Sequence, residues 1–264
     1  MESVIPLIDL GPSEEEGDGE GEHIYAVAHQ IRSACQDIGF FAIVNHGVHS
    51  AAIQNVWSAS RDFFDLSLEE KQRSMSENTT EYPYGYEHSE TLALGYNYNG
   101  VSLPDLKETF AIGPSNPDSG MPPRRCPDRP LHFKTALETY YEEMEKLAKR
   151  LLRIFAIALE LPSHWFENKF DRHQSALRLL NYPFLHDKPL PGQLRAGEHT
   201  DYGALTILKS GGPGLQVRRK DEWVDVPYLE DAFIINIGDL MQRWTNGMQK
   251  THLHCFVLFV EFSY

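Results

Sequence analysis

The sequence is poor in positive charge and has no long apolar run. Its 264 residues include 24 Lys and Arg against 38 Asp and Glu, which gives a formal net charge of −14. The one basic cluster, Arg218-Arg219-Lys220, is expected to be a solvated hairpin end, so no nucleic-acid partner is predicted. No apolar stretch is long enough to cross a bilayer, and the N-terminus has no signal-peptide pattern. We therefore expect no membrane partner.

Cysteine is also scarce. Cys35, Cys126 and Cys255 are far apart, odd in number and without Cys-x-x-Cys spacing. Neither a disulfide framework nor a zinc ribbon is indicated, and a reducing, cytoplasmic location is predicted. Hydrophobic residues make up 41% of the chain, which is enough for a sizeable core. Nothing in the pattern specifies an oligomeric state.

Helical spacing dominates the first part of the chain. Apolar residues recur every three or four positions over 22–38, 48–64 and 131–161, which predicts three helices, the last a long scaffold helix. The bounded apolar run 40–44 predicts a buried strand. Residues 76–130 are rich in Gly, Pro, Asn and Tyr and predict a long functional loop.

The second part changes to short apolar runs separated by turn residues, namely 176–180, 205–208, 215–217, 223–226 and 232–236. Such spacing is typical of strands in a β-sandwich or barrel. We therefore expect a mainly β fold with α, a jelly-roll core against an N-terminal α/β helical layer. The expected regions are an N-terminal region 1–120, a scaffold-helix region 121–170 and a core 171–264.

His199 and Asp201 stand two residues apart just before the apolar run 205–208. In an extended chain, residues i and i+2 face the same side. Two such ligands, joined by a histidine from a distant strand, form a facial triad that leaves open positions on a non-haem Fe(II). The spacing alone also fits a hydrogen-bonded loop pair, because the chain contains 12 histidines.

Several short motifs occur in a fixed order, and their combination is more specific than any one of them. They are Ile5-Pro6-Leu7-Ile8-Asp9-Leu10, Asp37-Ile38-Gly39-Phe40-Phe41, Val44-Asn45-His46-Gly47, Asp105-Leu106-Lys107-Glu108-Thr109-Phe110, Asn181-Tyr182-Pro183, Glu198-His199-Thr200-Asp201, Gly214-Leu215-Gln216-Val217 and Arg243-Trp244-Thr245-Asn246-Gly247. In this order they resemble the Fe(II)/2-oxoglutarate-dependent dioxygenases of the isopenicillin-N-synthase-like type. The resemblance implies a double-stranded β-helix core, Fe(II), 2-oxoglutarate as cosubstrate, molecular oxygen, and hydroxylation or another oxidation of a small organic substrate.

The resemblance also implies site residues. The family's second histidine ligand corresponds to His254, ten residues after Trp244, so the expected metal ligands are His199, Asp201 and His254. His252 competes because it shares the face of His254 in a strand, although a structural or surface role is expected for it.

Three residues of one segment are the expected cofactor-binding residues. Tyr182 either hydrogen-bonds the cosubstrate or packs its ring in the barrel. Arg178 is either a buried structural arginine or a carboxylate partner, and Asn181 leaves the same alternatives open.

Beyond His254 the sequence departs from the family pattern. The family has an Arg-x-Ser that grips the far carboxylate of 2-oxoglutarate, whereas here Cys255 follows the histidine and residues 255–264 contain no cation. The favoured interpretation is a product truncated at its C-terminus; the others are a different cation or a reaction without 2-oxoglutarate. The alternative functions are a catalytically impaired remnant or interaction module, and a 2-oxoglutarate-independent iron oxidase.

Other polar residues have simpler expected roles. His46 and Asp239 are expected in turns, the latter capping backbone amides. Lys107 and Glu108 either border the substrate mouth or form a solvated face, and the solvated face is favoured. The tyrosines of the long loop are expected to line a pocket for an apolar or aromatic substrate or to pack the loop, namely Tyr82, Tyr84, Tyr86, Tyr96 and Tyr98.

Overall fold

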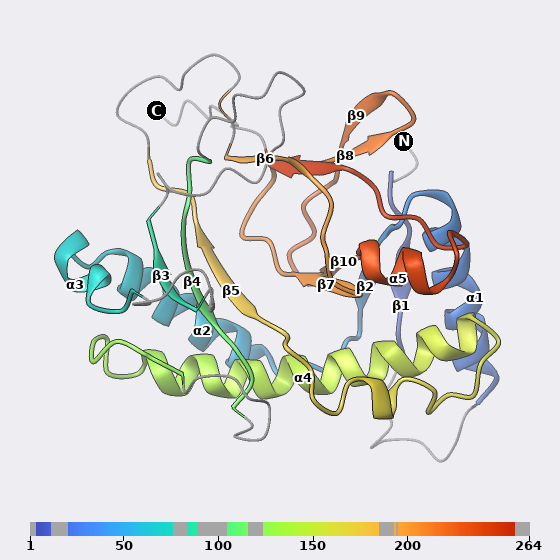
Figure 1. Cartoon of the computed structure of the whole chain (residues 1–264), viewed down its shortest axis with the longest axis horizontal. Coiled ribbons are helices and arrows are strands. Elements are labelled where there is room, and N and C mark those ends of the chain that lie inside the picture. The colour runs from blue at the N-terminus through green and yellow to red at the C-terminus, as the bar shows by residue number, and fades with distance from the viewer. Residues whose placement is uncertain are drawn as a thin grey trace.

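The computed structural model shows helices packed beside several small β-sheets, with a long helix running beneath the strands (Figure 1). It describes residues 4–11, 21–75, 84–88, 105–115, 124–184, 193 and 195–256. Within these residues, no helix combines the length and the apolar character that crossing a membrane requires.

Five α-helices lie in the described chain: α1 (Glu22–Asp37), α2 (Ser50–Phe64), α3 (Leu68–Gln72), α4 (Phe133–Ala158) and α5 (Asp239–Trp244). The apolar spacing over 22–38, 48–64 and 131–161 therefore predicted α1, α2 and α4 correctly to within a few residues. A capping box at Ser67 and Glu70 starts the short helix α3. Helix α4 packs against both α1 and α2 and serves as the scaffold helix.

The strands form three sheets. The first has the order β1 (Leu7–Asp9), β2 (Phe40–Val44), β10 (Phe233–Ile237), β7 (Leu205–Leu208). The second has the order β6 (Ala196–His199), β11 (His254–Phe256), β8 (Leu215–Arg219), β9 (Glu222–Asp225). The third joins β3 (Gly85–Glu87), β4 (Glu108–Ile112) and β5 (Leu177–Asn181). The five strands predicted in the second part are all present as β5, β7, β8, β9 and β10.

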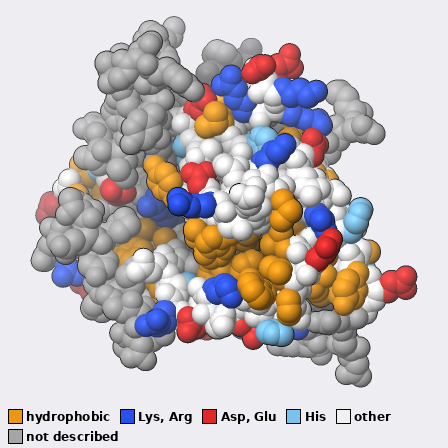
Figure 2. All heavy atoms as spheres, turned by 45° about the vertical axis from the view of Figure 1, so that its right-hand side comes forward, with side chains coloured by type: hydrophobic (Ala, Val, Ile, Leu, Met, Phe, Trp, Pro, Cys, Tyr) orange, Lys and Arg blue, Asp and Glu red, His pale blue; other side chains and the backbone are white. Residues whose placement is uncertain are grey.

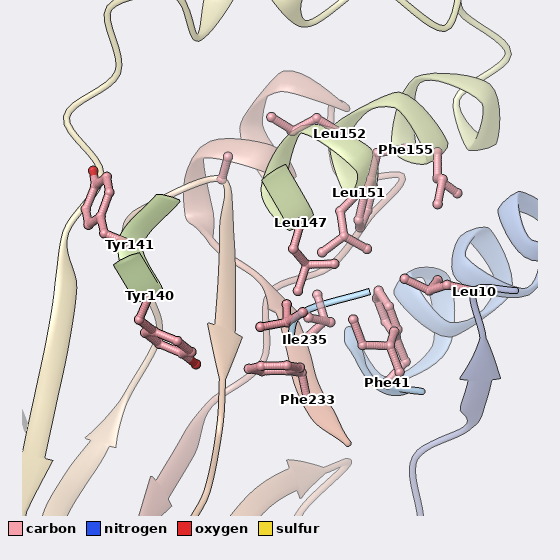
Figure 3. Packing of buried hydrophobic residues seen from close by; sticks show 14 of the residues in the cluster. Leu10, Phe41, Tyr140, Tyr141, Leu147, Leu151, Leu152, Phe155, Phe233 and Ile235 are labelled. Carbon is pink, nitrogen blue, oxygen red and sulfur yellow. The ribbon is translucent and has the colours of Figure 1, made fainter. Parts of the chain in front are cut away.

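Strands β2 and β10 are buried on both faces and separate two hydrophobic clusters. Phe41 of β2 and Ile235 of β10 belong to the larger cluster, shared with the helices, while Phe40 and Ile234 belong to a smaller one shared with β8. Figure 3 shows Leu147, Leu151 and Phe155 of α4 near Phe41, Phe233 and Ile235. The first sheet is thus covered by helices on one face and by the second sheet on the other.

Strand β4 lies inside the stretch 76–130, where a loop was predicted. Its five residues are all buried, and Phe110 packs edge-on against Phe63 and Phe133 with ring centroids 5.0 and 4.9 Å away. The prediction that Lys107 and Glu108 form a solvated face is wrong, because the two residues are only 4% and 6% exposed. Each is paired with an opposite charge inside the protein, which makes their burial tolerable. Tyr82, Tyr96 and Tyr98 lie outside the described residues.

Part of the apolar surface stays exposed, and Figure 2 shows apolar side chains gathered between charged ones on one face. Trp244, at the end of α5, is 46% exposed, but its ring stacks on Phe166 at 6.2 Å and meets Phe170 edge-on at 5.9 Å. These contacts fix α5 against the chain that follows α4. The fold is mixed α/β, so the expectation of a mainly β chain is confirmed only in part.

Candidate metal centre

Three side chains with metal-binding atoms converge between the first two sheets. One ligand atom each from His199, Asp201 and His254 lies within 4.8 Å of the other two. Asp201 Oδ1 is 3.8 Å from His199 Nε2 and 3.9 Å from His254 Nε2. In the described part of the chain, no other group of three His, Cys, Asp or Glu side chains comes this close. The predicted ligand set is therefore brought together in space.

Strand pairing places the two imidazoles side by side. His199 ends β6 and His254 begins β11, and the antiparallel register sets the two residues directly opposite each other. Their ring centroids are 4.3 Å apart. The ring of Phe40 in β2 packs edge-on against His254, with ring centroids 5.4 Å apart. The first sheet therefore contacts the histidine pair.

The first sheet orients the carboxylate. Thr206 on β7 and Asn236 on β10 are register partners, and both donate hydrogen bonds to Asp201 Oδ2, from Asn236 Nδ2 at 2.7 Å and from Thr206 Oγ1. Oδ1 is the oxygen that faces the two histidines. The carboxylate is thus held in a fixed orientation by residues that do not themselves bind metal.

Backbone contacts with the start of α5 also hold Asp201 in place. Asp239 N donates to the Asp201 carbonyl at 2.7 Å, at the start of α5. A Cβ on Gly238 would lie 2.2 Å from the Gly203 carbonyl oxygen and 2.7 Å from that of Asp201, so only glycine fits at this close approach. The turn predicted for Asp239 is wrong, because Asp239 is the first residue of α5 and its carboxylate accepts from the side-chain hydroxyl Thr200 Oγ1 at 3.2 Å.

The surroundings of His254 and Asp201 favour the protonation states that a divalent cation needs. Burial lowers the pKa of His254, and the adjacent His199 lowers it further, which favours the neutral imidazole. Burial alone would raise the pKa of Asp201, but the His254 ring and the hydrogen bonds from Asn236 and Thr206 outweigh it and keep the pKa below its usual value. Two histidines and one carboxylate are the donor set of a non-haem Fe(II) site.

The triad opens into a cavity of about 1430 Å³. Arg178, Tyr182 and Asn181, the three predicted cofactor-binding residues, also line it. Leu177 and Leu179 of β5 pack toward the helices, so the alternation of a strand places Arg178 on the opposite face. Asn181 turns its amide toward Glu108 Oε1, to which it donates at 2.7 Å. Cofactor binding by these three residues stays a prediction.

His252 and His46 lie outside the metal-binding group. His252 packs beside Gly39, and its Nε2 is buried without a hydrogen-bond partner. His46 sits in the predicted turn, between Asn45 and Gly47 with φ of 51° and 79°, and its ring packs edge-on to Phe233 at 4.6 Å.

Sequence reasoning missed the residues that support the ligands. Asn236 and Thr206 each interrupt an apolar strand with a polar side chain, and that interruption was the available signal. Asp105, which contacts the backbone of β6, was also missed because it lies in the stretch predicted as a loop.

Comparison with known families gives matches in both parts of the chain. Residues 5–132 match the N-terminal domain described as non-haem dioxygenase in morphine synthesis, and residues 173–260 match the 2OG-Fe(II) oxygenase superfamily. The 2-oxoglutarate-dependent dioxygenase caaD of Aspergillus niger is 34% identical over 95% of this chain and 78% of its own length. Clavatol oxidase claD of Penicillium crustosum is 33% identical over 95% of this chain and 80% of its own length.

Solved structures agree with these matches. A full-length Neurospora crassa protein, determined in complex with alpha-KG, superimposes with a TM-score of 0.85 at 28% identity, and the match covers 99% of this chain and 81% of that one. The matches thus extend over 95% or more of this chain and over about four fifths of each relative's own length. The chain belongs to the 2OG-Fe(II) oxygenase superfamily and is a 2-oxoglutarate-dependent dioxygenase, an oxidoreductase that uses Fe(II).

Proposed function

We propose that the cavity beside the triad holds 2-oxoglutarate and a small organic substrate together, and that the substrate is hydroxylated or otherwise oxidised there. The supporting observation is that the three ligand side chains share one cavity of about 1430 Å³ with Arg178 and Tyr182. Pockets for one drug-sized ligand span roughly 300–1,000 Å³, so two small molecules fit. Bound Fe(II) and 2-oxoglutarate supply the oxidising chemistry, and the chain supplies position and exclusion of water.

The proposed core is a double-stranded β-helix made of the two four-stranded sheets, within the expected region 171–264 and completed by β1 and β2. The contact of Phe40 with His254 and the cluster shared by β2, β10 and β8 support this arrangement. In it, one sheet carries both histidines, while β7 and β10 of the other orient Asp201. The expected N-terminal region 1–120 and scaffold region 121–170 then buttress the core.

Arg178 and Tyr182 are the proposed partners of the far carboxylate of 2-oxoglutarate. Burial raises the pKa of Tyr182, and the charge of Asp105 adds to this, so the phenol stays protonated and can donate a hydrogen bond. Arg178 is exposed to the cavity and offers a planar fork of donors that matches a carboxylate. Asn181 positions this segment through Glu108 in the same scheme.

Replacing Arg178 with Met should weaken 2-oxoglutarate binding about 10- to 100-fold, because a charged hydrogen bond contributes about 1.5–3 kcal/mol. Tyr182→Phe, which removes one neutral donor, should weaken it by about tenfold or less. The measurement is anaerobic titration of the Fe(II)-loaded protein with 2-oxoglutarate.

Arg219→Met is the matched control, since Arg219 lies at the β8–β9 turn and pairs with Asp37 on the surface. It should bind 2-oxoglutarate with wild-type affinity. Unchanged affinity in Arg178→Met would rule out Arg178 as the carboxylate partner.

The substrate is proposed to be small and partly apolar or aromatic. Tyr202 directly follows Asp201, lines the cavity and is 78% exposed, and Leu180 lines the cavity from β5. Tyr84 lines it as well, whereas Tyr86 points into a buried polar network instead. An exposed aromatic ring beside the metal ligands suits a flat or apolar molecule. The Neurospora crassa protein has also been solved in complex with alpha-KG and thymine. A cytoplasmic location remains part of the proposal.

A further inference from the structure

A buried ion pair lies beside the strand that carries His199. Asp105 and Lys107 lie just before β4, and Lys107 Nζ donates to Asp105 Oδ2 at 2.7 Å. Their side chains are only 4% and 5% exposed. Lys107 lines the same cavity as the metal ligands. A charge pair this deeply buried costs desolvation, so its presence calls for a physical reason.

The second oxygen of Asp105 reaches a distortion in β6. His254 pairs with His199, and Phe256 pairs with Ala196. The paired residues are therefore three positions apart in β6 but only two positions apart in β11. The extra residue makes a β-bulge, a feature that bends a strand and redirects its side chains. Within this bulge, Gly197 N donates to Asp105 Oδ1 at 2.8 Å. Asp105 therefore holds the bulge in β6 from the side of β4.

The same glycine contacts the iron ligand. His199 Nδ1 lies 2.7 Å from the Gly197 carbonyl oxygen, a distance at which Nδ1–H donates to that carbonyl. Donation from Nδ1 leaves the Nε2 lone pair for a metal, and Nε2 is the atom that faces Asp201 Oδ1. Gly197 thus links Asp105 on one side to the ring of His199 on the other.

We propose that Asp105 is a positioning residue for the iron ligand His199, acting through the backbone of Gly197, and that Lys107 keeps Asp105 available by balancing its charge. Asp105 fixes the bulge, the bulge fixes the Gly197 carbonyl, and this carbonyl sets the tautomer and orientation of the ring. The expected consequence of losing the Asp105 acceptor is weaker iron binding without loss of any ligand. Partners of this kind typically change metal affinity 10- to 100-fold.

Two double variants isolate the acceptor from the charge. Asp105→Asn with Lys107→Met removes both charges but keeps an oxygen that accepts from Gly197 N. Asp105→Leu with Lys107→Met removes both charges and the acceptor while keeping the branched shape of the Asp105 side chain. Neither variant leaves an unpaired charge from this ion pair inside the protein, so we expect both to fold. Near-ultraviolet circular dichroism checks their packing.

The experiment is anaerobic calorimetric titration of each purified full chain with Fe(II). The asparagine pair should bind iron close to wild type, and the leucine pair about 10- to 100-fold more weakly. Equal affinities in the two pairs would overturn the proposal, whether both are high or both low. The His199→Ala chain, titrated alongside, shows separately whether the ligand assignment itself holds.

A second readout needs no metal. The ¹⁵N NMR spectrum of the His199 ring reports which nitrogen carries the proton in each variant. The wild-type chain and the asparagine pair should hold the proton on Nδ1, and the leucine pair should show a mixture of tautomers. A ring that keeps the Nδ1 proton fully in the leucine pair would show that Asp105 is only a structural brace.

Discussion

The His199→Ala chain is expected to lose stoichiometric Fe(II) binding and, with it, iron-dependent formation of succinate from 2-oxoglutarate. The substitution removes one of the three protein ligands and leaves only Asp201 and His254. Because loss of a supporting residue alone already costs 10- to 100-fold in affinity, loss of a ligand should cost more than about 100-fold. Metal analysis of protein reconstituted under anaerobic conditions gives the iron stoichiometry.

His252→Ala provides the matched control. His252 lies two residues before His254 and is partly buried, but it is not in the metal-binding group. This chain should keep one iron per protein. Retention of one tightly bound iron by His199→Ala, or its loss only in His252→Ala, would refute the ligand assignment.

The Lys71→Met chain is expected to be about 3–5 kcal/mol less stable to unfolding, because it leaves the Glu108 carboxylate buried without its counter-charge. Lys71 Nζ lies 2.9 Å from Glu108 Oε2, and both side chains are nearly inaccessible. Tyr86 and Asn181 also donate to Glu108, so the network joins α3, β3, β4 and β5. Chemical denaturation measures the free energy of unfolding.

Two controls separate charge burial from other effects. Adding Glu108→Gln to Lys71→Met should recover part of the lost stability, because no buried charge then remains unpaired. Arg73→Met breaks the surface pair with Glu69, whose side chains are 71% and 83% exposed, and should cost less than about 1 kcal/mol. Equal losses in Lys71→Met and Arg73→Met would contradict the role assigned to the network.

Periodic elements could be predicted from the sequence because their apolar spacing matches how they are buried. Helix α4 presents one apolar face over 26 residues, and β2 is a bounded apolar run. Strand β4 could not be predicted in this way, since its sequence Glu-Thr-Phe-Ala-Ile begins with a charge. Only the distant partners of Glu108, which come from three other elements, make that charge tolerable inside the protein.

In the candidate site, too, some residues could be predicted from local sequence, whereas their orientation could not. His199 and Asp201 could be identified from local spacing, and His254 from the order of motifs. The orientation of Asp201 depends on the register of β7 against β10, and that of His199 on a bulge and on Asp105. These are contacts between residues far apart in the sequence, which spacing along one segment does not encode.

The most direct test of the central claim is anaerobic titration of the purified chain, first with Fe(II) and then with 2-oxoglutarate, followed by visible absorption. Chelation of iron by 2-oxoglutarate produces a charge-transfer band. We expect one equivalent of iron to bind and the band to grow to saturation with one equivalent of 2-oxoglutarate. Iron binding without any band would contradict a 2-oxoglutarate-dependent reaction at the site formed by His199, Asp201 and His254.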